Sequence, residues 1–462
     1  MGGYPMRAID LFCGAGGFSA GFEAAGIDVL YGCDIAERAL DTFDANHDGD
    51  GLRHDISDGV PPEVADVSVD IVFGSPPCKG FSDARGSRRL DDERNQLVFS
   101  FIQWVEHFQP KYVMMENVAG MTTISDEFLG AIEREYADAG YAVDWETLNA
   151  ADFGVPQTRE RVIYFGVRDD LDVEPSLPEG GYREASEGQL TLAGELMRGW
   201  TTVSDALEDL PEPTENGEVS LPPLSEYPEN DYLPLVRDGA ETTWNHVAKE
   251  PSDDEDTRHI VDELRPGEMY RSSRFGDRYR QVWEVLEHRF SDVEQDALHF
   301  IARHRSRKDF RMSGKSVGAV PDHLIADHLE HDEGSVYDAL ERLHGDGWIR
   351  TDEEDDTLGY DLNTKSGIRP RYMRLTPDGQ SNTILTTDFN PRDKLHPTEN
   401  RGLSLREGAR IQSFPDSFRF TGSFDDIANQ IGNAVPPLMA QRLADHLLDV
   451  HERGSQHVTA SD

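Results

Sequence analysis

The sequence predicts an α/β fold built on a mostly parallel sheet. Between residues 7 and 170, short apolar runs such as "VDIVFGSPP" and "KYVMMENV" alternate with helix-like segments such as 94 to 108. Strands that alternate with helices form parallel sheets covered by helices. From about residue 171 the sequence becomes acidic and rich in proline and glycine, and helical periodicity returns at 427 to 450. This change predicts a loop-rich region between the sheet and a late helical segment.

The composition predicts a soluble protein with one large core and a smaller domain. The chain has 462 residues, 37% of them apolar, and no apolar run long enough to span a membrane. The N-terminus lacks the features of a signal peptide and there are three cysteines, so we expect a reducing cytoplasm. The formal net charge of −45 with few lysines resembles proteins of halophilic archaea, since molar salt screens such a surface. An ordinary acidic protein is the alternative.

Basic residues gather in one region, 265 to 311, where arginines and aromatic residues recur. This region is the candidate contact for nucleic acid, because arginines bridge phosphates and read guanine edges. The following pattern, about 295 to 363, predicts a helix, a turn, a helix and a hairpin, faintly like a winged helix. The alternative is an acidic helical insertion without DNA contact. We expect no metal site among the nearby histidines, because the cysteines lie elsewhere.

The stretch "AIDLFCGAGGFSAGFEAAG", residues 8 to 26, is an apolar strand that leads into a glycine loop and a helix. Glycines at this position let backbone amides approach a ligand at the carboxyl end of the first strand. Asp34 follows the loop at the distance expected of an acid that binds ribose hydroxyls, and Asp55 would end the third strand. A nucleotide-like ligand is therefore predicted, with surface carboxylates as the alternative for each aspartate.

The stretch "FGSPPCKGFS" places Cys78 on a stiff loop at the end of a strand. Pro76 and Pro77 fix two φ angles, and Gly80 frees the chain just beyond. A thiolate is a strong nucleophile, and α/β sheets present their sites on such loops. Cys78 is therefore a candidate nucleophile, and a buried apolar cysteine is the alternative.

Two further strands carry polar side chains toward the same edge. "KYVMMENV" ends in Glu116 and Asn117, and a carboxyl there could protonate a ring nitrogen. Gln157, Arg159 and Arg161 alternate into the next strand, so their side chains point the same way. An amide and two guanidiniums suit a carbonyl oxygen, a carboxylate or a phosphate. The alternative is a solvated strand face.

Taken in order, "DLFCGAGGFSAGF", "GSPPCKGFS", "ENV", "QTRER", "LSLREGARIQSFPDSF" and "QIGNAVPPLMA" resemble the motifs of the cytosine-C5 DNA methyltransferase family. The resemblance covers roughly residues 7 to 170 and 371 to 445. It implies a Rossmann-like, S-adenosylmethionine-dependent methyltransferase domain, 1–170 and 425–462, with an inserted smaller target-recognition domain, 171–424. The winged-helix-like insertion at about 295–363 would lie inside the latter.

The resemblance also implies the activity and its residues. The enzyme would methylate C5 of a cytosine in a specific DNA sequence, after the base is flipped out and Cys78 attacks C6. Glu116 would hold or protonate N3, with Arg159 and Arg161 fixing Glu116 and the base carbonyl. The residues implied to bind S-adenosylmethionine are Asp10, Phe12, Cys13, Gly14, Ala15, Gly16, Gly17, Phe18, Asp34, Ile35, Asp55, Ile56, Pro76, Leu97, Asn433 and Ala434. Those expected to bind the DNA substrate are Lys79, Gly80, Phe81, Ser82, Asn117, Gln157, Arg303, Arg305 and Arg307.

The motifs depart from the family pattern at two positions. Lys79 stands where members often carry glutamine, which could alter loop contacts or lower the thiol pKa, and Ser75 replaces a frequent glycine. Arg406 and Arg410 are expected to be structural. Two alternatives stay open: a transfer-RNA methyltransferase of the same architecture, and a DNA-binding homologue without catalysis. The expected partners are double-stranded DNA and a separately acting restriction endonuclease, and the expected state is a monomer.

Overall fold

The structure is a computed structural model that describes most of the chain in two compact units. The described residues are 5–77, 96–123, 126–184, 198–270, 279–305, 307, 309–310, 312, 318–354, 357–363 and 372–461. The first unit comprises Met1–Ala248, Asp378–Thr387 and Ser404–Asp462, and the second comprises Lys249–Pro377 and Asp388–Leu403. Among the described residues, no helix is both long and apolar enough to cross a membrane.

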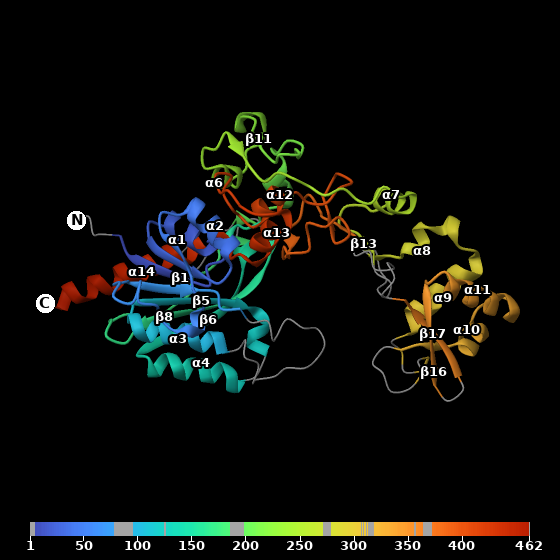
Figure 1. The fold of residues 1–462 in the computed structure, drawn as a ribbon, viewed down its shortest axis with the longest axis horizontal. Helices are drawn as coiled ribbons and strands as arrows, with labels where there is room; N and C mark the ends of the chain where they lie inside the picture. Colours follow the sequence, from blue (N-terminus) through green and yellow to red (C-terminus); the bar gives the residue numbers. More distant parts are fainter. Residues whose placement is uncertain are drawn as a thin grey trace. The chain divides into compact units, whose positions relative to one another are not determined.

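A seven-stranded sheet forms the centre of the first unit and confirms the predicted α/β class (Figure 1). Its strands are β1 (Arg7–Leu11), β2 (Asp28–Asp34), β3 (Asp50–Arg53), β4 (Ile71–Gly74), β5 (Tyr112–Val118), β6 (Tyr141–Asn149) and β8 (Glu160–Arg168). The order across the sheet is β3-β2-β1-β4-β5-β8-β6. All neighbouring pairs from β3 to β5 are parallel, and β8 runs antiparallel to both β5 and β6. The start of β8 therefore lies at the same edge as the end of β5.

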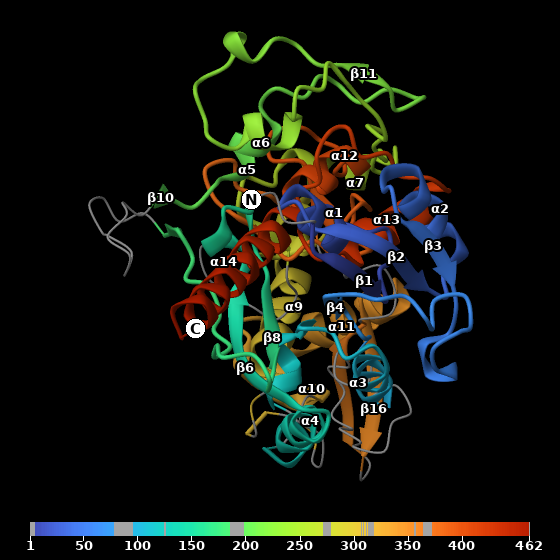
Figure 2. The same cartoon turned by 90° about the vertical axis from the view of Figure 1, so that its left-hand side faces the viewer.

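Helices cover both faces of this sheet, as Figures 1 and 2 show. On one face lie α1 (Gly17–Ala24), α2 (Glu37–Asn46) and α14 (Pro437–Ser461), and on the other lie α3 (Gln96–Phe108) and α4 (Asp126–Asp138). Gly21 allows α1 and α14 to approach closely, because a Cβ there would lie 2.4 Å from the Ala440 Cβ. The late helix thus packs on the first one, although some 400 residues separate them.

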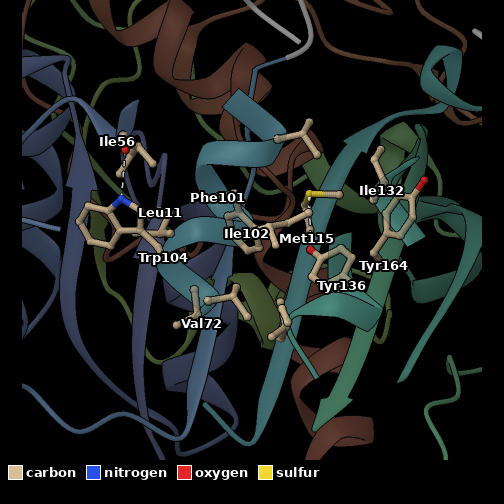
Figure 3. Packing of buried hydrophobic residues seen from close by; sticks show 14 of the residues in the cluster. Leu11, Ile56, Val72, Phe101, Ile102, Trp104, Met115, Ile132, Tyr136 and Tyr164 are labelled. Atoms are coloured by element: carbon tan, nitrogen blue, oxygen red, sulfur yellow. Dashed lines mark hydrogen bonds between the residues drawn. The ribbon is translucent and has the colours of Figure 1, made fainter. Parts of the chain in front are cut away.

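The core beneath the sheet is built on α3 (Figure 3). Trp104, Phe101 and Ile102 are buried against Val72 and Met115 of the central strands. The Trp104 indole Nε1 donates a hydrogen bond of 3.0 Å to the carbonyl of Ile56, so the one polar atom of this ring is satisfied in the core. The apolar side chains of α3 therefore pack against the sheet that carries the predicted site.

The remaining short elements of the first unit connect this sheet to its surroundings. They are η1 (Ile56–Asp58), η3 (Ala119–Thr123), η4 (Ala150–Phe153), β7 (Gln157–Thr158), β9 (Tyr182–Arg183), β10 (Arg198–Gly199), α5 (Val203–Leu207), β11 (Val219–Ser220), η5 (Leu224–Glu226), α6 (Leu233–Arg237), β12 (Thr242–Thr243), β19 (Ser381–Asn382), α12 (Leu405–Ile411) and α13 (Phe424–Asn433).

The compact units do not follow the domain boundaries predicted from the sequence. The first unit continues past residue 170 to Ala248, and it includes Ser404 onward rather than 425 onward. The physical reason is a buried ionic network. Asp209, from the acidic stretch, pairs with Arg410 of α12 and with Arg237 of α6, in the latter case at 2.8 Å. The target-recognition role of 171–424 stays a prediction.

Arg410 is the centre of this network and has no solvent exposure. Its guanidinium also binds the Asp416 carboxylate, with Nε–Oδ1 and Nη2–Oδ2 distances of 2.9 and 2.6 Å. Burial lowers the pKa of Arg410, but the carboxylates of Asp416 and Asp209 raise it further, so the net shift is upward. Arg406 donates to the carbonyls of Trp244, Pro415 and Phe418. The predicted structural roles of both arginines are confirmed.

The second unit is built around short strands and helices. Its elements are α7 (Glu255–Asp262), β13 (Met269–Tyr270), β14 (Tyr279–Arg280), α8 (Val282–Val285), η6 (Glu287–Arg289), α9 (Asp292–His304), β15 (Val320–Pro321), α10 (Asp322–His328), α11 (Glu333–Gly345), β16 (Ile349–Glu354), β17 (Thr357–Leu362), β18 (Met373–Arg374) and β20 (Lys394–Leu395). One sheet has the order β14-β13-β18-β20 and another β15-β17-β16. The buried Arg374 donates to the carbonyls of Leu264 and His396 and so ties distant segments of the unit together.

We predict that Arg410→Met destabilises the protein by about 3–5 kcal/mol, because it leaves the buried Asp416 carboxylate without its cation and leaves Asp209 with Arg237 alone. The free energy of unfolding would be measured by urea denaturation. Arg442→Met is the matched control, since Arg442 is half exposed and its pair with Asp445 spans 3.5 Å. The control should change stability by less than about 0.5 kcal/mol. Equal losses in the two variants would contradict the role given to the network.

Candidate active site

The site lies at the carboxyl edge of the sheet. The strand order reverses at β1, which lies between β2 and β4. In open α/β sheets, the crevice at such a reversal is where ligands bind. The predicted residues after β1, at the end of β2, after β4 and at the end of β5 belong to this edge, because these strands are parallel.

The glycine loop after β1 is held by Asp34 at the end of β2. The amide of Gly14 donates to Asp34 Oδ2 at 2.9 Å, and the amide of Ala36 donates to Oδ1 at 2.8 Å. Phe12 has a φ of 61°, in the left-handed region that is unusual for a residue with a side chain. Asp34 therefore fixes both the glycine loop and the backbone that follows β2. Beside it, Ile35 is 64% exposed and offers an apolar surface to a flat ring.

Asp10 lies buried beneath the loop. Its Oδ2 accepts a hydrogen bond of 2.7 Å from the Ser19 hydroxyl, while Oδ1 is buried and has no hydrogen-bond partner. Burial, with a further contribution from Asp34, raises the pKa of Asp10 well above its usual range, although the bond from Ser19 opposes the shift. A buried acceptor without a partner is costly and often marks a functional position. The arrangement fits a ligand with a hydrogen-bond donor above the loop.

His47 supports the loop from below, and sequence reasoning did not find it. Its Nδ1 lies 2.7 Å from Glu23 Oε2, its ring stacks on Phe43, and its side chain is 1% exposed. Gly16 has a φ of 89°, and a Cβ there would lie 2.1 Å from His47 Nε2. Only glycine fits between this backbone conformation and the imidazole. A histidine 30 residues downstream carries no sequence signal for such a contact.

The other predicted cofactor residues of the loop face inward. Cys13, Ala15 and Phe18 are buried, and the Phe18 ring packs edge-on against Phe73 at 4.9 Å. Burial raises the pKa of the Cys13 thiol well above its usual range. These residues can therefore offer a ligand their backbone but not their side chains. Gly17 lies close to the end of α13, since a Cβ there would lie 2.6 Å from the Val435 carbonyl oxygen.

The late segment brings Asn433 and Ala434 to this part of the fold, and they are exposed and half-buried respectively. Asp55 is exposed and accepts from the Ser57 amide and hydroxyl, which lower its pKa. The side chain of Ile56 is buried in the core, so only its backbone could meet a ligand. Leu97, in the first turn of α3, is half-buried.

Asn117 is a positioning residue in this structure. Its Nδ2 donates to the carbonyl of Pro76 at 2.9 Å, its Oδ1 accepts from the amide of Val118, and it is 2% exposed. Both polar atoms of the Asn117 side chain are hydrogen-bonded to backbone, and its predicted contact with the substrate stays a prediction. The hydrogen bond to Pro76 fixes the point from which the cysteine loop starts. The predicted residues Cys78, Lys79, Gly80, Phe81 and Ser82 lie outside the described residues.

Glu116, Arg161 and Arg159 form the charged centre of the site. Arg161 Nε lies 2.8 Å from Glu116 Oε1, and both side chains are largely buried. Arg159 is 2% exposed and donates to the carbonyls of Ile384 and Gly432 at 3.4 and 3.3 Å. Burial, and then the charge of Arg161, lower the pKa of Arg159 to about 9, while Glu116 opposes the shift. One carboxylate beside two guanidiniums leaves this buried centre with a net positive charge.

Gln157, predicted to bind the substrate, has its side-chain amide engaged within the protein. It is fully buried, and its Nε2 donates to the Ile411 carbonyl at 2.9 Å and to Gln412 Oε1 at 2.6 Å. Its Oε1 accepts from the Ile384 amide at 3.0 Å. The alternation of residues 157, 159 and 161 predicted that their side chains point the same way. The side-chain amide of Gln157 is instead hydrogen-bonded to residues 384, 411 and 412.

The arginines predicted to contact DNA separate into two groups. Arg303 and Arg307 are exposed in the second unit. Arg305 is buried, with Nε and Nη2 lying 3.0 and 3.2 Å from the Asp361 carboxylate. A guanidinium held in this way cannot reach a phosphate, so the prediction for Arg305 was wrong. Arg303, Arg305 and Arg307 are evenly spaced in the sequence, and the fold shows that the side chain of Arg305 is the buried one.

The fold is α/β, and the carboxyl edge of its sheet carries a buried acid beside two guanidiniums. Residues 6–449 match the family of C-5 cytosine-specific DNA methylases. A type II methyltransferase of Thalassovita gelatinovora, M.AgeI, is 33% identical over 95% of this chain and 98% of its own length. M.DdeI of Desulfomicrobium norvegicum is 30% identical over 96% and 88%. The chain belongs to the C-5 cytosine-specific DNA methylase family.

A solved structure shares the fold. A putative DNA modification methyltransferase encoded within a prophage, from E. coli, superimposes with a TM-score of 0.56 at 22% identity, covering 97% of this chain and 99% of its own. At this level of identity the likeness shows the fold alone.

We predict that Asp10→Asn stabilises the protein at neutral pH, because the neutral amide keeps the size of the side chain and removes the cost of ionising a buried carboxyl. The folded pKa of Asp10 is raised, so its stabilising contribution is present below the unfolded pKa and is lost as pH rises through the folded pKa. The gain of the variant should therefore grow with pH from about 4 upward. Thermal unfolding across pH would measure it, with exposed Asp28→Asn as the control. A variant that is less stable at every pH would contradict this reading.

Proposed function

We propose that the protein methylates C5 of cytosine within a specific DNA sequence and uses S-adenosylmethionine as methyl donor. The observation that carries the proposal is the buried Glu116–Arg161 pair with Arg159 beside it, at the edge where the family motifs meet. A net positive centre stabilises negative charge that develops on a ring and its carbonyl oxygen. Among the three described side chains of this centre, Glu116 carries the carboxyl that could hold a ring nitrogen.

The residues around the glycine loop fit the cofactor. The backbone from Phe12 to Phe18 would receive it, the exposed side chain of Ile35 would cover its adenine ring, and the carboxylate of Asp34 would meet its ribose. The partnerless Oδ1 of Asp10 offers an acceptor beneath the loop. When bound, S-adenosylmethionine supplies an electrophilic methyl group attached to a sulfonium.

Cys78 is the proposed nucleophile, on the strength of its motif and the family. Its thiolate would form a bond to C6, which moves the electron pair of the C5–C6 double bond toward C5. Glu116 would hold or protonate N3 during this addition. Once C5 had used this electron pair to take up the methyl group, loss of the C5 proton to a base would restore the double bond and release the Cys78 thiolate from C6. The cytosine must leave the duplex stack first, because no thiol reaches C6 inside a helix.

We also propose that the enzyme acts alongside a restriction endonuclease and that it is active at high salt concentration. The relatives M.AgeI and M.DdeI are named type II methyltransferases, which supports a partner that cuts the same site. The net charge of −45 supports a salty cytoplasm, since screening relieves repulsion between surface carboxylates. In such salt the phosphate contribution to DNA affinity weakens, so base contacts should carry more of it.

Bisulfite sequencing of plasmid DNA incubated with the protein and S-adenosylmethionine in molar KCl tests the proposal. Methylated cytosines in one short recurring context are expected, and none with Cys78→Ser. Methylation of transfer RNA instead of DNA would favour the RNA enzyme. DNA binding without methylation of either nucleic acid would favour the silent homologue.

We predict that Glu116→Gln lowers the methylation rate by about 10²–10⁴-fold, because proton transfer and ring stabilisation at N3 are lost. Glutamine keeps the size of the side chain, so DNA and cofactor affinities should change little. Single-turnover methylation and binding measurements would separate the two effects. The matched control is Glu146→Gln, an exposed position on β6, which should leave the rate unchanged. A Glu116→Gln enzyme with the wild-type rate would exclude Glu116 from the chemistry.

A further inference from the structure

Six elements of the second unit form a segment with its own core. From α9 to β17 the order is helix, strand, helix, helix, strand, strand, and the antiparallel sheet has the order β15-β17-β16. Figure 1 shows α9, α10 and α11 gathered beside the hairpin of β16 and β17. The buried residues of this core include Leu298, Ile301, Leu340 and Ile349. This order of elements is that of winged-helix modules.

We propose that this segment, the α9–β17 module, is a winged-helix-type module that binds duplex DNA through a basic and aromatic patch formed by described residues of α9 and α10 together with Arg307 and Phe310. The inference rests on the proposed function, since the duplex is the substrate DNA outside the flipped base. The module would give the protein a second contact with the substrate DNA. This contact would lie on α9 and α10 rather than on α11. In helix-turn-helix proteins the helix in the position of α11 enters the major groove.

The patch comprises Arg303, His304, Arg307, Phe310 and His328. The His304 ring stacks on Phe300 at 4.1 Å and lies 4.4 Å from the Phe310 ring. The guanidinium of Arg307 lies over Phe310 at 5.0 Å, and the exposed His328 lies 5.1 Å from the same ring. Stacking on Phe310 restricts the Arg307 side chain, so less conformational entropy is lost when it meets a phosphate.

Arg305 gives the patch its rigidity. Its buried pair with Asp361 ties the end of α9 to β17, and Arg350 of β16 binds the same carboxylate at 2.8 Å. Because Arg305 points inward from the C-cap of α9, the neighbouring Arg303 and Arg307 are directed to solvent. The residue that was wrongly predicted to contact DNA is therefore a positioning residue for the two that remain.

The exposed face of α11 does not suit DNA. Glu333, Asp338 and Glu341 are exposed along this helix, and its Arg342 lies 3.3 Å from Glu294. Carboxylates along a helix repel phosphates and would have to be neutralised before the groove could accept them. The hairpin adds the exposed Glu353. The charges of the module therefore favour the patch over α11 as its contact with DNA.

The expected contribution of the patch is modest. Exposed Asp309 and Asp327 belong to the same segments, so the local field is less positive than the arginines alone would give. Two guanidiniums that meet two phosphates should contribute about 2 to the slope of log affinity against log salt, at roughly 0.9 for each phosphate. This size distinguishes the patch from the main recognition surface, whose loss would abolish specific methylation.

The test compares two duplexes that share the methylated site, one of about four helical turns and one of about one and a half turns. Affinities of the full-length protein are measured by fluorescence anisotropy over a range of KCl concentrations. In Arg303→Gln/Arg307→Gln, the preference for the long duplex should disappear and the salt slope should fall by about 2. Circular dichroism confirms that the variant is folded.

The matched control neutralises α11 through Asp338→Asn/Glu341→Gln and should leave both affinities unchanged. If this control strengthens binding of the long duplex while the arginine variant does not weaken it, α11 faces DNA and the proposal is overturned. If neither variant alters binding, the module contacts no DNA, and a protein partner becomes the next candidate. A wild-type protein that binds both duplexes but methylates neither would refute the proposed function while the salt slopes still decide this inference. A wild type that binds neither would refute both.

Discussion

The ion pair between Glu116 and Arg161 is the interaction on which the site depends. β8 runs antiparallel to β5, and Val118 of β5 lies opposite Arg161 of β8. Glu116 is two residues before Val118, so its carboxylate can pair with the Arg161 guanidinium on the neighbouring strand. Arg159 extends the same centre to the carbonyls of Ile384 and Gly432. A buried charge without such partners would be strongly destabilising. Arg159 thus links the charged centre to the late segments of the chain that return to the sheet.

The end of β1 and the glycine loop that follows it contain groups that destabilise the fold. The carboxyl of Asp10 is buried with one oxygen unsatisfied, and Phe12 adopts a left-handed conformation. Backbone strain and unmet polar groups of this kind persist only where the surroundings hold them in place. Asp34 from the neighbouring strand and His47 beneath Gly16 provide that support. The loop is consequently shaped before any ligand arrives.

The sequence predicted the parallel sheet and the carboxyl-edge location of Glu116, because strand ends and glycine loops are local signals. It could not predict what lies opposite a side chain. Gln157 and Arg305 match their neighbours in spacing, but Gln412 and Asp361 come from segments 255 and 56 residues away and turn both inward. The first compact unit continues past residue 170 for the same reason, because Asp209 pairs with Arg410 of α12. Long-range partners decide these positions.

The central claim is that the cysteine loop, anchored by Asn117 at Pro76, delivers a nucleophile to a base held at Glu116. The most direct test uses a duplex with 5-fluorocytosine at the methylated position, since fluorine at C5 cannot leave as a proton does. Incubation with S-adenosylmethionine, proteolysis and mass spectrometry would identify the peptide joined to the base. The account predicts one adduct, on the peptide that contains Cys78. An adduct on the peptide of Cys13 or Cys33, or none in a protein that methylates DNA, would contradict it.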